Sequence, residues 1–219
     1  MVNLKRAGMM DEIHCDEKDY LIWKWRPANN TRRENAIRWG SSLRVREGSV
    51  AVFVCRRKGQ DAIQEFIEGP FDEVLETSNL PIIASFVAAA YGGGTPFQAE
   101  VYFINLAKVI QSRFAVRYFD VFDQRFPDFG VPVAVRGALT FKIADCREFI
   151  ELHRLDEFTL EDFQSQVRDA VSRRVKSLVA NMPSKLGIPL LQLAGRTDDL
   201  SELTNTDPSP QLREVFGIE

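Results

Sequence analysis

The stretch YGGGTPFQAEVYFINL (residues 91–106) places three glycines and a Thr-Pro pair directly before a run rich in apolar and aromatic residues. A phosphate-binding P-loop requires a lysine and a serine or threonine after its last glycine, but Gly94 is followed by Thr95 and Pro96. A dinucleotide fingerprint requires a helix at this point, whereas the residues from Phe97 onward favour a strand. The sequence therefore predicts a glycine turn that leads into a strand, and not a phosphate site.

Strand patterns extend outward from this stretch over most of the chain before residue 146. The segment SLRVREGSVAVFVC (42–55) predicts two strands around a tight turn. The segment IQEFIEGPFDEVLETSNLPII (63–83) predicts a further pair of short strands, interrupted by Gly-Pro and Asn-Leu-Pro. VPVAVRGALTFKIAD (131–145) is another strand candidate, and residues 1–13 have the spacing of a short amphipathic helix.

The pattern changes to helical periodicity near residue 146. CREFIELHRL (146–155) is the first helical segment, and Thr159 with Asp162 is close to a capping box for the next one. Apolar residues then recur every four positions from Phe163 to Val175, which is the clearest helix signal in the chain. The predicted fold class is α+β, with a β-rich domain and C-terminal helices packed on it.

The composition is that of a globular protein without an obvious polyanionic partner. The 219 residues are 45% hydrophobic and 27% charged, and the formal net charge is −3. The three cysteines have no CxxC spacing, which argues against a disulfide framework and indicates a reducing compartment. The N-terminal segment lacks the apolar stretch of a signal peptide, and no segment has the roughly 18 apolar residues of a membrane-spanning helix. We therefore expect a cytoplasmic protein, located peripherally at the inner face of the membrane if it contacts one.

The sequence offers no catalytic constellation. His14 and His153 are the only histidines, and Cys146 would lie two helical turns from His153, about 10 Å away. Two histidines and three scattered cysteines do not supply a clustered ligand set for a metal ion. We therefore expect no catalytic residues, no metal, no cofactor and no small-molecule substrate.

Basic and tryptophan residues are interleaved between residues 23 and 46, with seven basic residues against a single acid, Glu34. We call them the Trp/Arg region: Trp23, Lys24, Trp25, Arg26, Arg32, Arg33, Arg38, Trp39, Arg44 and Arg46. The chain from Asp198 to its end is acidic instead. Such a region could bind single-stranded nucleic acid, an anionic membrane surface or an acidic patch on a neighbouring copy. It could equally be a set of solvated strand edges protected by charge.

Three motifs resemble the Band 7 (stomatin, prohibitin, flotillin) superfamily, also called SPFH, and its bacterial branch labelled virion core protein-like. The resemblance covers about residues 20–180. The first motif is matched by Ile37, Gly40, Ser41, Leu43, Val45, Glu47 and residues 51–54. The second is matched by Leu75, Glu76, Thr77, Asn79 and Pro81, and the third by Pro96, Phe97, Ala99, Glu100, Val101, Tyr102 and Phe103.

The resemblance implies a Band 7-like α+β domain at residues 20–195, after an N-terminal segment (1–19) and before an acidic C-terminal segment (196–219). It implies a non-enzymatic scaffold that self-associates at the cytoplasmic membrane surface, in envelope-stress maintenance, with a membrane protein or anionic lipid as further partner. Its signature residues are expected to be structural. The alternatives are a peptide- or nucleic-acid-binding adaptor, nucleic acid being the less favoured ligand, and a phage-related structural protein.

Two regions differ from the family pattern. Phe71 follows Gly69-Pro70 where the superfamily usually has a glycine, and SRFAVRYFDVFDQRF (112–126) occupies the place of a Trp-Gly-Thr element. The last residues, LREVFGIE (212–219), resemble the entry to a further strand. The resemblance thus leads us to expect that the natural chain continues beyond Glu219.

Overall fold

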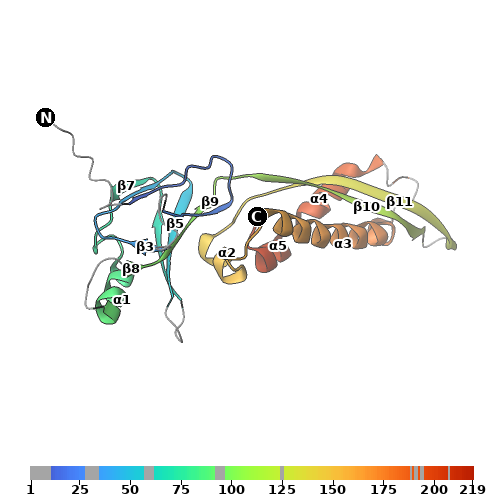
Figure 1. Ribbon diagram of the computed structural model, residues 1–219. Coiled ribbons are helices and arrows are strands. Elements are labelled where there is room, and N and C mark those ends of the chain that lie inside the picture. The colour runs from blue at the N-terminus through green and yellow to red at the C-terminus, as the bar shows by residue number, and fades with distance from the viewer. Residues whose placement is uncertain are drawn as a thin grey trace. The chain divides into compact units, whose positions relative to one another are not determined.

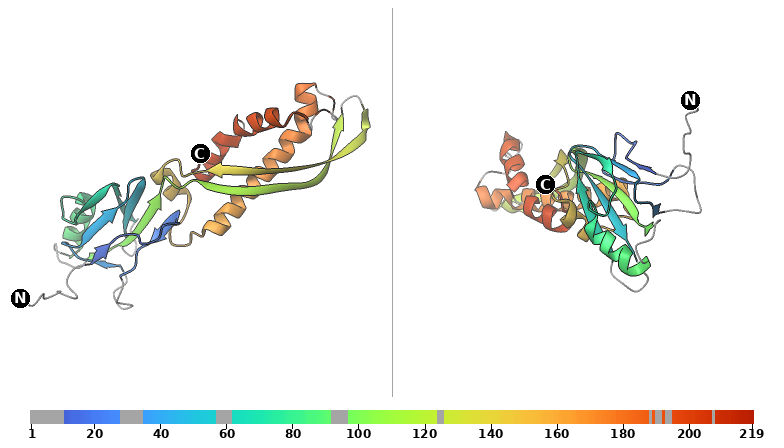
Figure 2. Two further views of the ribbon diagram at one scale, coloured as in Figure 1. Left: turned by 90° about the horizontal axis from the view of Figure 1, so that it is seen from above. Right: turned by 90° about the vertical axis from the view of Figure 1, so that its left-hand side faces the viewer.

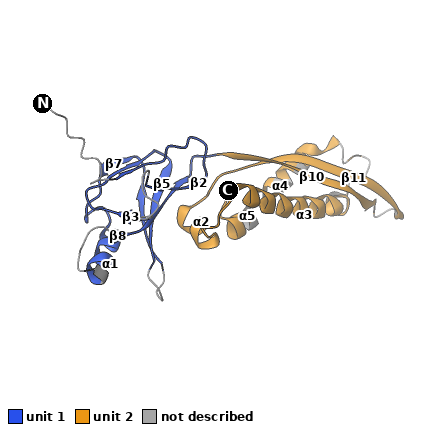
Figure 3. Cartoon of the chain, viewed as in Figure 1, with its two compact units in different colours: residues 1–108 blue, residues 109–219 orange. Residues whose placement is uncertain are grey.

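The computed structural model forms two compact units, residues 1–108 and 109–219 (Figure 3). It describes residues 11–27, 35–56, 62–91, 97–123, 126–187, 189, 192, 195–206 and 208–219. Each unit has β-sheet and helical structure of its own (Figure 1). The predicted α+β class is confirmed, whereas the sequence placed residues 20–195 in one domain and did not predict a division at residue 108.

Unit 1 is built around a strand that is buried along its whole length. This strand, β5 (Ser49–Cys55), lies between β6 (Ile63–Glu68) and β9 (Glu100–Asn105), and β2 (Ile22–Lys24) pairs with the other edge of β9. All neighbouring strands in this sheet are antiparallel. Because side chains alternate along a strand, burial of every residue means that both faces of β5 are covered.

Two smaller sheets complete the β-structure of unit 1. In the first, β4 (Ser42–Val45) pairs with β1 (Glu12–Ile13) in parallel and with β7 (Phe71–Val74) in antiparallel orientation. In the second, β3 (Ala36–Ile37) pairs with β8 (Phe97–Gln98). Buried side chains from all three sheets form one core cluster, to which β5 contributes Ala51, Phe53 and Cys55.

The N-terminal part of the chain differs from the prediction. Residues 1–10 of the expected amphipathic helix lie outside the described residues, and Glu12 and Ile13 form the short strand β1 instead of the end of a helix. Ile13 is fully buried and pairs with Leu43, so the burial of its side chain in the sheet outweighs the local helical spacing.

The only helix of unit 1 among the described residues, α1 (Pro81–Tyr91), was not predicted. The sequence predicts short strands for the segment that ends in Pro81-Ile82-Ile83. A proline is well tolerated in the first turn of a helix, where its missing N–H has no intrahelical acceptor. The Asn79 side chain accepts a hydrogen bond from the Glu76 amide at 2.7 Å, which stabilises the turn before the helix.

A buried carboxylate from a different strand caps α1. Glu65 on β6 is 7% exposed, and its two oxygens accept hydrogen bonds from the amides of Ile82 and Ile83 at 3.2 and 2.9 Å. These are amides of the first helical turn, which have no acceptor within the helix. The same carboxylate, together with burial, raises the pKa of the Cys55 thiol to about 11, with burial as the larger cause.

The described residues of unit 2 form a long antiparallel hairpin and four helices. The hairpin strands are β10 (Ile110–Asp123) and β11 (Phe126–Phe141), which pair from Ile110 opposite Phe141 to Asp123 opposite Phe126. The helices are α2 (Cys146–Leu152), α3 (Leu160–Leu186), α4 (Thr197–Thr206) and α5 (Pro208–Phe216). Helix α3 packs against β10 through its apolar stripe, which includes Val167, Val171 and Val175.

The C-terminal residues were predicted as the entry to a strand, but Pro208–Phe216 form a helix. Among these last residues only Ile218 and Glu219 are extended, and main-chain hydrogen bonds of Gly217 and Glu219 pair this end of the chain with residues 142–144. The change of direction occurs at Gly217, whose φ of 66° is in the left-handed region that favours glycine.

An aromatic cluster holds the helices of unit 2 together. The Phe163 ring on α3 lies 5.6 Å from Phe149, 5.2 Å from His153 and 6.1 Å from Phe216, between ring centroids. His153 also hydrogen-bonds through Nε2 to the Phe216 carbonyl at 3.1 Å. Burial lowers the pKa of this histidine, so the neutral ring is the form that the cluster favours.

We expect the Glu65→Ala variant to have a free energy of unfolding about 1–3 kcal/mol lower than the parent, because two helix amides lose their acceptor. Urea denaturation measures the difference. The matched control is Glu68→Ala on the same strand, since Glu68 is exposed and its removal should change stability by less than about 0.5 kcal/mol. Equal effects of the two substitutions would contradict the capping role.

The free energy of unfolding should fall as the pH drops below about 6.5 because of His153. Its pKa is lowered in the folded state from the ordinary value of 6.5, so the unfolded chain takes up the proton first. The contribution of neutral His153 to the free energy of unfolding is therefore complete above pH 6.5. It is lost as the pH falls through the pKa of His153 in the folded state. Urea denaturation at pH 7.5 to 5 should show a weaker pH dependence in His153→Gln, and an unchanged dependence would contradict this role.

Candidate functional site

The three tryptophans of the Trp/Arg region point into the protein. Trp25 is 5% exposed and belongs to the core cluster of unit 1. Trp23 is half-buried, with its ring 5.8 Å from that of Phe103, and Trp39 lies 4.7 Å from Phe97. These indoles are occupied by packing against β8 and β9, so they do not form an exposed platform on which bases could stack.

Lys24 is held by a carboxylate of the third family motif. Its Nζ forms an ion pair with Glu100 and lies 5.3 Å from the centre of the Tyr102 ring. Tyr102 donates to the second oxygen of Glu100 at 3.2 Å, and Arg56 approaches that oxygen to 3.6 Å. Burial lowers the pKa of Lys24, but its hydrogen bond to Glu100 and the nearby charges raise it overall. The network therefore keeps the Lys24 ammonium charged, and the Glu100 carboxylate neutralises that charge within the protein.

The arginines of the region are in part neutralised as well. Arg44 pairs with Asp72 at 3.1 Å, and Arg46 donates to the Glu17 carbonyl at 3.0 Å. Arg26 is exposed. Arg38 is half-buried, whereas Arg32 and Arg33 lie outside the described residues. The described part of the Trp/Arg region is thus a mixed-charge surface over packed indoles.

The first two family motifs meet through main-chain hydrogen bonds. The Gly40 amide donates to the Leu75 carbonyl at 2.9 Å, and the Leu75 amide donates to the Ser41 carbonyl at 2.8 Å. The Ser41 hydroxyl also accepts a hydrogen bond from the Asp11 amide at 3.3 Å. Ser41 and Leu75 are fully buried, so these residues join β4 to the end of β7.

The remaining signature residues occupy turns and the core. Asn79 and Pro81 form the entry to α1, and Phe97 is buried against Trp39. Glu47 and Thr77 are exposed in turns, and Pro96 lies outside the described residues together with the three glycines before it.

A small polar cavity lies near the N-terminal end of unit 1. Its volume is about 300 Å3, and its lining includes His14, Cys15, Asp16 and Tyr20. His14 Nε2 lies 2.7 Å from the Asp16 carboxylate, and the Tyr20 hydroxyl lies 3.1 Å from that of Ser49. Burial raises the pKa of both the Cys15 thiol and the Tyr20 hydroxyl, so both are protonated at neutral pH. A protonated thiol is a poor nucleophile, despite the adjacent histidine.

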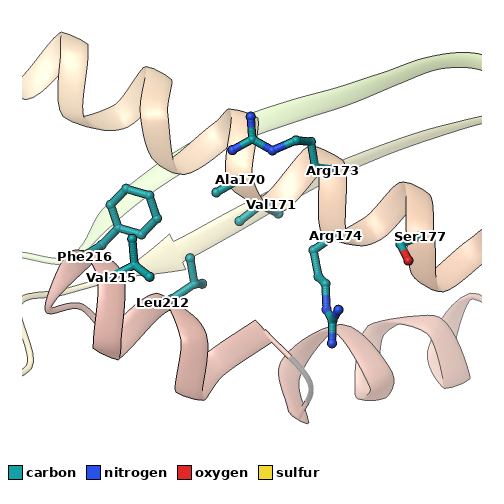
Figure 4. A pocket seen from close by; sticks show the side chains of 8 residues that line it. All are labelled: Ala170, Val171, Arg173, Arg174, Ser177, Leu212, Val215 and Phe216. Carbon is teal, nitrogen blue, oxygen red and sulfur yellow. The ribbon is translucent and has the colours of Figure 1, made fainter.

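Unit 2 contains two larger cavities. The first, of about 340 Å3, lies between α3 and α5, and Figure 4 shows Leu212, Val215 and Phe216 facing Ala170 and Val171 across it. The second has a volume of about 610 Å3 and lies along β11, with α3, α4 and α5 contributing to its walls. Among the described residues, no group of three or more His, Cys, Asp or Glu side chains could hold a metal ion.

Exposed aromatic side chains gather towards the distal end of the β10–β11 hairpin. Tyr118 is 80% exposed, Phe129 66% and Phe122 53%. Phe122 pairs with Gly130, and its ring lies over that glycine, where an added Cβ would come within 2.9 Å of it. This surface was not among the predicted sites, although aromatic and charged residues alternate in residues 112–126 of the sequence.

The amino-acid sequence places the chain in a known family. The model of the SPFH domain-Band 7 family matches residues 25–219, and the chain belongs to this family. Comparisons with curated proteins and with solved structures gave no match. In the parts of the chain that the structure describes, no helix is both long enough and apolar enough to cross a membrane.

We expect Glu100→Gln to lower the free energy of unfolding by about 1–3 kcal/mol, because Lys24 and Tyr102 lose a charged partner in a half-buried position. Thermal or urea denaturation measures this change. The comparison variant is Asp72→Asn, whose ion pair with Arg44 is exposed and should contribute less than about 1 kcal/mol. A stable Glu100→Gln protein that had lost an interaction with a partner would contradict the structural role.

Proposed function

We propose that the protein is a non-enzymatic, self-associating scaffold that acts at the cytoplasmic surface of a membrane. Family membership supports the general class, since Band 7 proteins are generally non-enzymatic scaffolds. The resemblance to the bacterial virion core protein-like branch supports a role in envelope-stress maintenance. A second copy of the chain, a membrane protein or anionic lipid are the partners of this proposal.

The observation that carries the proposal is the outer face of the β10–β11 hairpin. On this face, Tyr118 and Phe122 are exposed together with Arg113 and Arg136. The strand register places Arg113 opposite Ala138 and Arg136 opposite Ala115, so the two arginines belong to neighbouring cross-strand pairs. Exposed aromatic rings on a face that also carries arginines suit an interfacial membrane surface and also suit protein contacts.

Charge complementarity between copies is a second support. The Trp/Arg region retains the exposed Arg26, and exposed acidic side chains in unit 2 include Asp198 and Glu214. A head-to-tail contact between a basic and an acidic surface is heterologous, and such contacts close into rings when the rotation between copies allows it. Lys24 and Arg44 already form ion pairs with Glu100 and Asp72 within the chain. The positive charge available to another copy is therefore smaller than the sequence suggested.

The adaptor alternative has less support from the structure. Binding of single-stranded nucleic acid would require exposed indoles, but Trp25 is buried and Trp23 and Trp39 are packed. No feature of the described residues specifically supports a phage-related structural protein.

The test compares the parent protein with the double variant Tyr118→Ser/Phe122→Ser. Light scattering after size exclusion measures the mass in solution, and co-sedimentation with vesicles of phosphatidylserine and phosphatidylcholine measures membrane binding. We expect the parent to form assemblies or to bind the vesicles, and the double variant to lose about tenfold or more in that property. Ile82→Ser is the matched control, because Ile82 is 54% exposed on α1, which belongs to unit 1 and contributes no residue to the hairpin.

A second set of variants tests the contribution of charge. Changing Arg32, Arg33 and Arg38 to glutamate should weaken assembly or binding to acidic lipid, and the effect should decrease at high salt. A parent protein that is monomeric and does not bind vesicles would overturn the proposal.

A further inference from the structure

The outer face of the β10–β11 hairpin is exposed on both strands. Every second residue of β10 from Gln111 to Ala115, and of β11 from Pro132 to Thr140, is exposed, whereas the residues between them are buried or half-buried. In the left view of Figure 2 the two strands cross in front of α3, so this view faces the outer side of the hairpin. The side chains on this face are therefore available to another molecule.

The charged side chains of the outer face are sorted by sign along the hairpin. Arg113 and Arg136 belong to neighbouring cross-strand pairs in the half that is farther from the turn. Arg117 follows at the bulge of β10, in the middle of the strand. Asp120 lies beyond the bulge, towards the turn, and the exposed Asp128 is closer still to the turn. One half of the hairpin is thus positive and the other half is negative.

Arg113 and Asp120 are opposite charges on the same strand, but they are far apart. Both are exposed, and among the described residues neither has an ion-pair partner. Their cross-strand partners, Ala138 and Pro132, are six residues apart, which corresponds to about 20 Å along the strand. The two side chains therefore do not reach each other within one copy, whereas a second copy with its strands reversed brings one over the other.

We propose that two copies of the chain pack outer face against outer face, with their hairpins in opposite directions around a two-fold axis. The inference rests on the proposed function and names a second copy as the partner at this surface. The axis passes midway between Arg113 and Asp120, so that Arg113 of each copy lies over the partner's Asp120. A two-fold contact uses the same patch on both copies, and a face with one positive and one negative half is complementary to its own reversed image.

The small side chains of the face leave room for the exposed tyrosine in such a contact. Sheets that pack face to face lie about 10 Å apart, so large side chains fill the space between them. The axis runs between Ala115 and Tyr118, which places the Tyr118 ring of each copy over the partner's Ala115. Tyr118 is 80% exposed, and Ala134 and Ala138 add little bulk beside it. The contact removes from water an aromatic ring that one copy alone leaves in solvent.

A second copy suits this face better than a lipid surface does. Asp120 lies between Tyr118 and Phe122 on β10 and is exposed with them. Its carboxylate would repel anionic headgroups, whereas a second copy places an arginine over it.

The dimensions of the face predict a weak dimer. The cross-strand pairs from Thr140 to Gly130 cover ten residues of β11, so the face is about 34 Å long, and two strands are about 10 Å wide. This area is smaller than the roughly 800 Å2 per partner of a typical stable complex, so we expect association in the micromolar range.

The test reverses one charge at a time and measures the mass of the complete chain of residues 1–219 by sedimentation equilibrium. We expect the parent to dimerise below about 1 mM, and Arg113→Asp or Asp120→Arg to weaken the dimer by about tenfold or more, because two like-charge contacts replace two opposite ones. Arg168→Asp is the matched control, since Arg168 is an exposed arginine on α3, which packs on the other face of the hairpin.

Mixing the two variants gives the specific signature. In the Arg113→Asp chain both positions are acidic, and in the Asp120→Arg chain both are basic. An equimolar mixture should therefore form the dimer that neither variant forms alone, and this restoration also shows that both variants are folded. Both substitutions together in one chain should restore the dimer as well.

Cross-linking tests the position of the two-fold axis. Ala115 lies next to the axis, so Ala115→Cys should give a covalent dimer with bismaleimidohexane. Gln111→Cys is the matched control, because Gln111 is exposed on the same strand but about five residue steps, roughly 17 Å, from the axis. The three cysteines of the chain are buried, so the parent protein supplies the background. Equal cross-linking of the two variants would overturn this arrangement.

The remaining outcomes separate this inference from the proposed function. A parent that assembles with a mass unaffected by Arg113→Asp and Asp120→Arg would overturn the two-fold contact, while self-association elsewhere would leave the proposed function standing. A parent that sediments with vesicles as a monomer would show a lipid surface and exclude the second copy. A parent that neither assembles nor binds vesicles would overturn both.

Discussion

The period-two alternation of the β10–β11 hairpin is the constraint on which the arrangement of unit 2 depends. From Ile110 to Val116, every second side chain of β10 turns towards α3. Packing of the valine stripe of α3 covers this face, and the aromatic contacts of Phe163 tie α2 and α5 to the same helix. Helix α3 packs over β10, and the inward-facing apolar side chains of β11 are half-buried. The exposed outer face of the hairpin follows from that one-sided packing.

Unit 1 shows how the family motifs act physically. Its central strand β5 is buried on both faces, so the polar groups beside it need partners inside the protein. Glu65 supplies acceptors for two amides of α1, and Glu100 compensates Lys24. Gly40, Ser41 and Leu75 exchange main-chain hydrogen bonds between two strands. These motif residues therefore stabilise the fold of unit 1, and surfaces available to partners lie elsewhere.

The sequence predicted the fold class and the long helix because both rest on local periodicity. It also identified the strand that follows the three glycines in the sequence, which appears as β8 and β9. It missed α1, since Pro81 followed by two isoleucines resembles the end of a strand, and the capping carboxylate of Glu65 is 17 positions away from Ile82 in the chain. It selected the tryptophans as candidate surface residues because composition shows that aromatic and basic residues are interleaved but not in which direction the indoles point.

The sequence by itself determined the alternation of apolar residues in the strands, the valine stripe of α3 and the motifs by which the family is recognised. These are properties of neighbouring residues and need no knowledge of the rest of the chain. Only the tertiary structure decided that Trp25 is buried, that Tyr118 and Phe122 are exposed, and that residues 217–219 pair with the strand extension at residues 142–144. Burial and strand pairing depend on segments far apart in the chain, so local sequence patterns do not determine them.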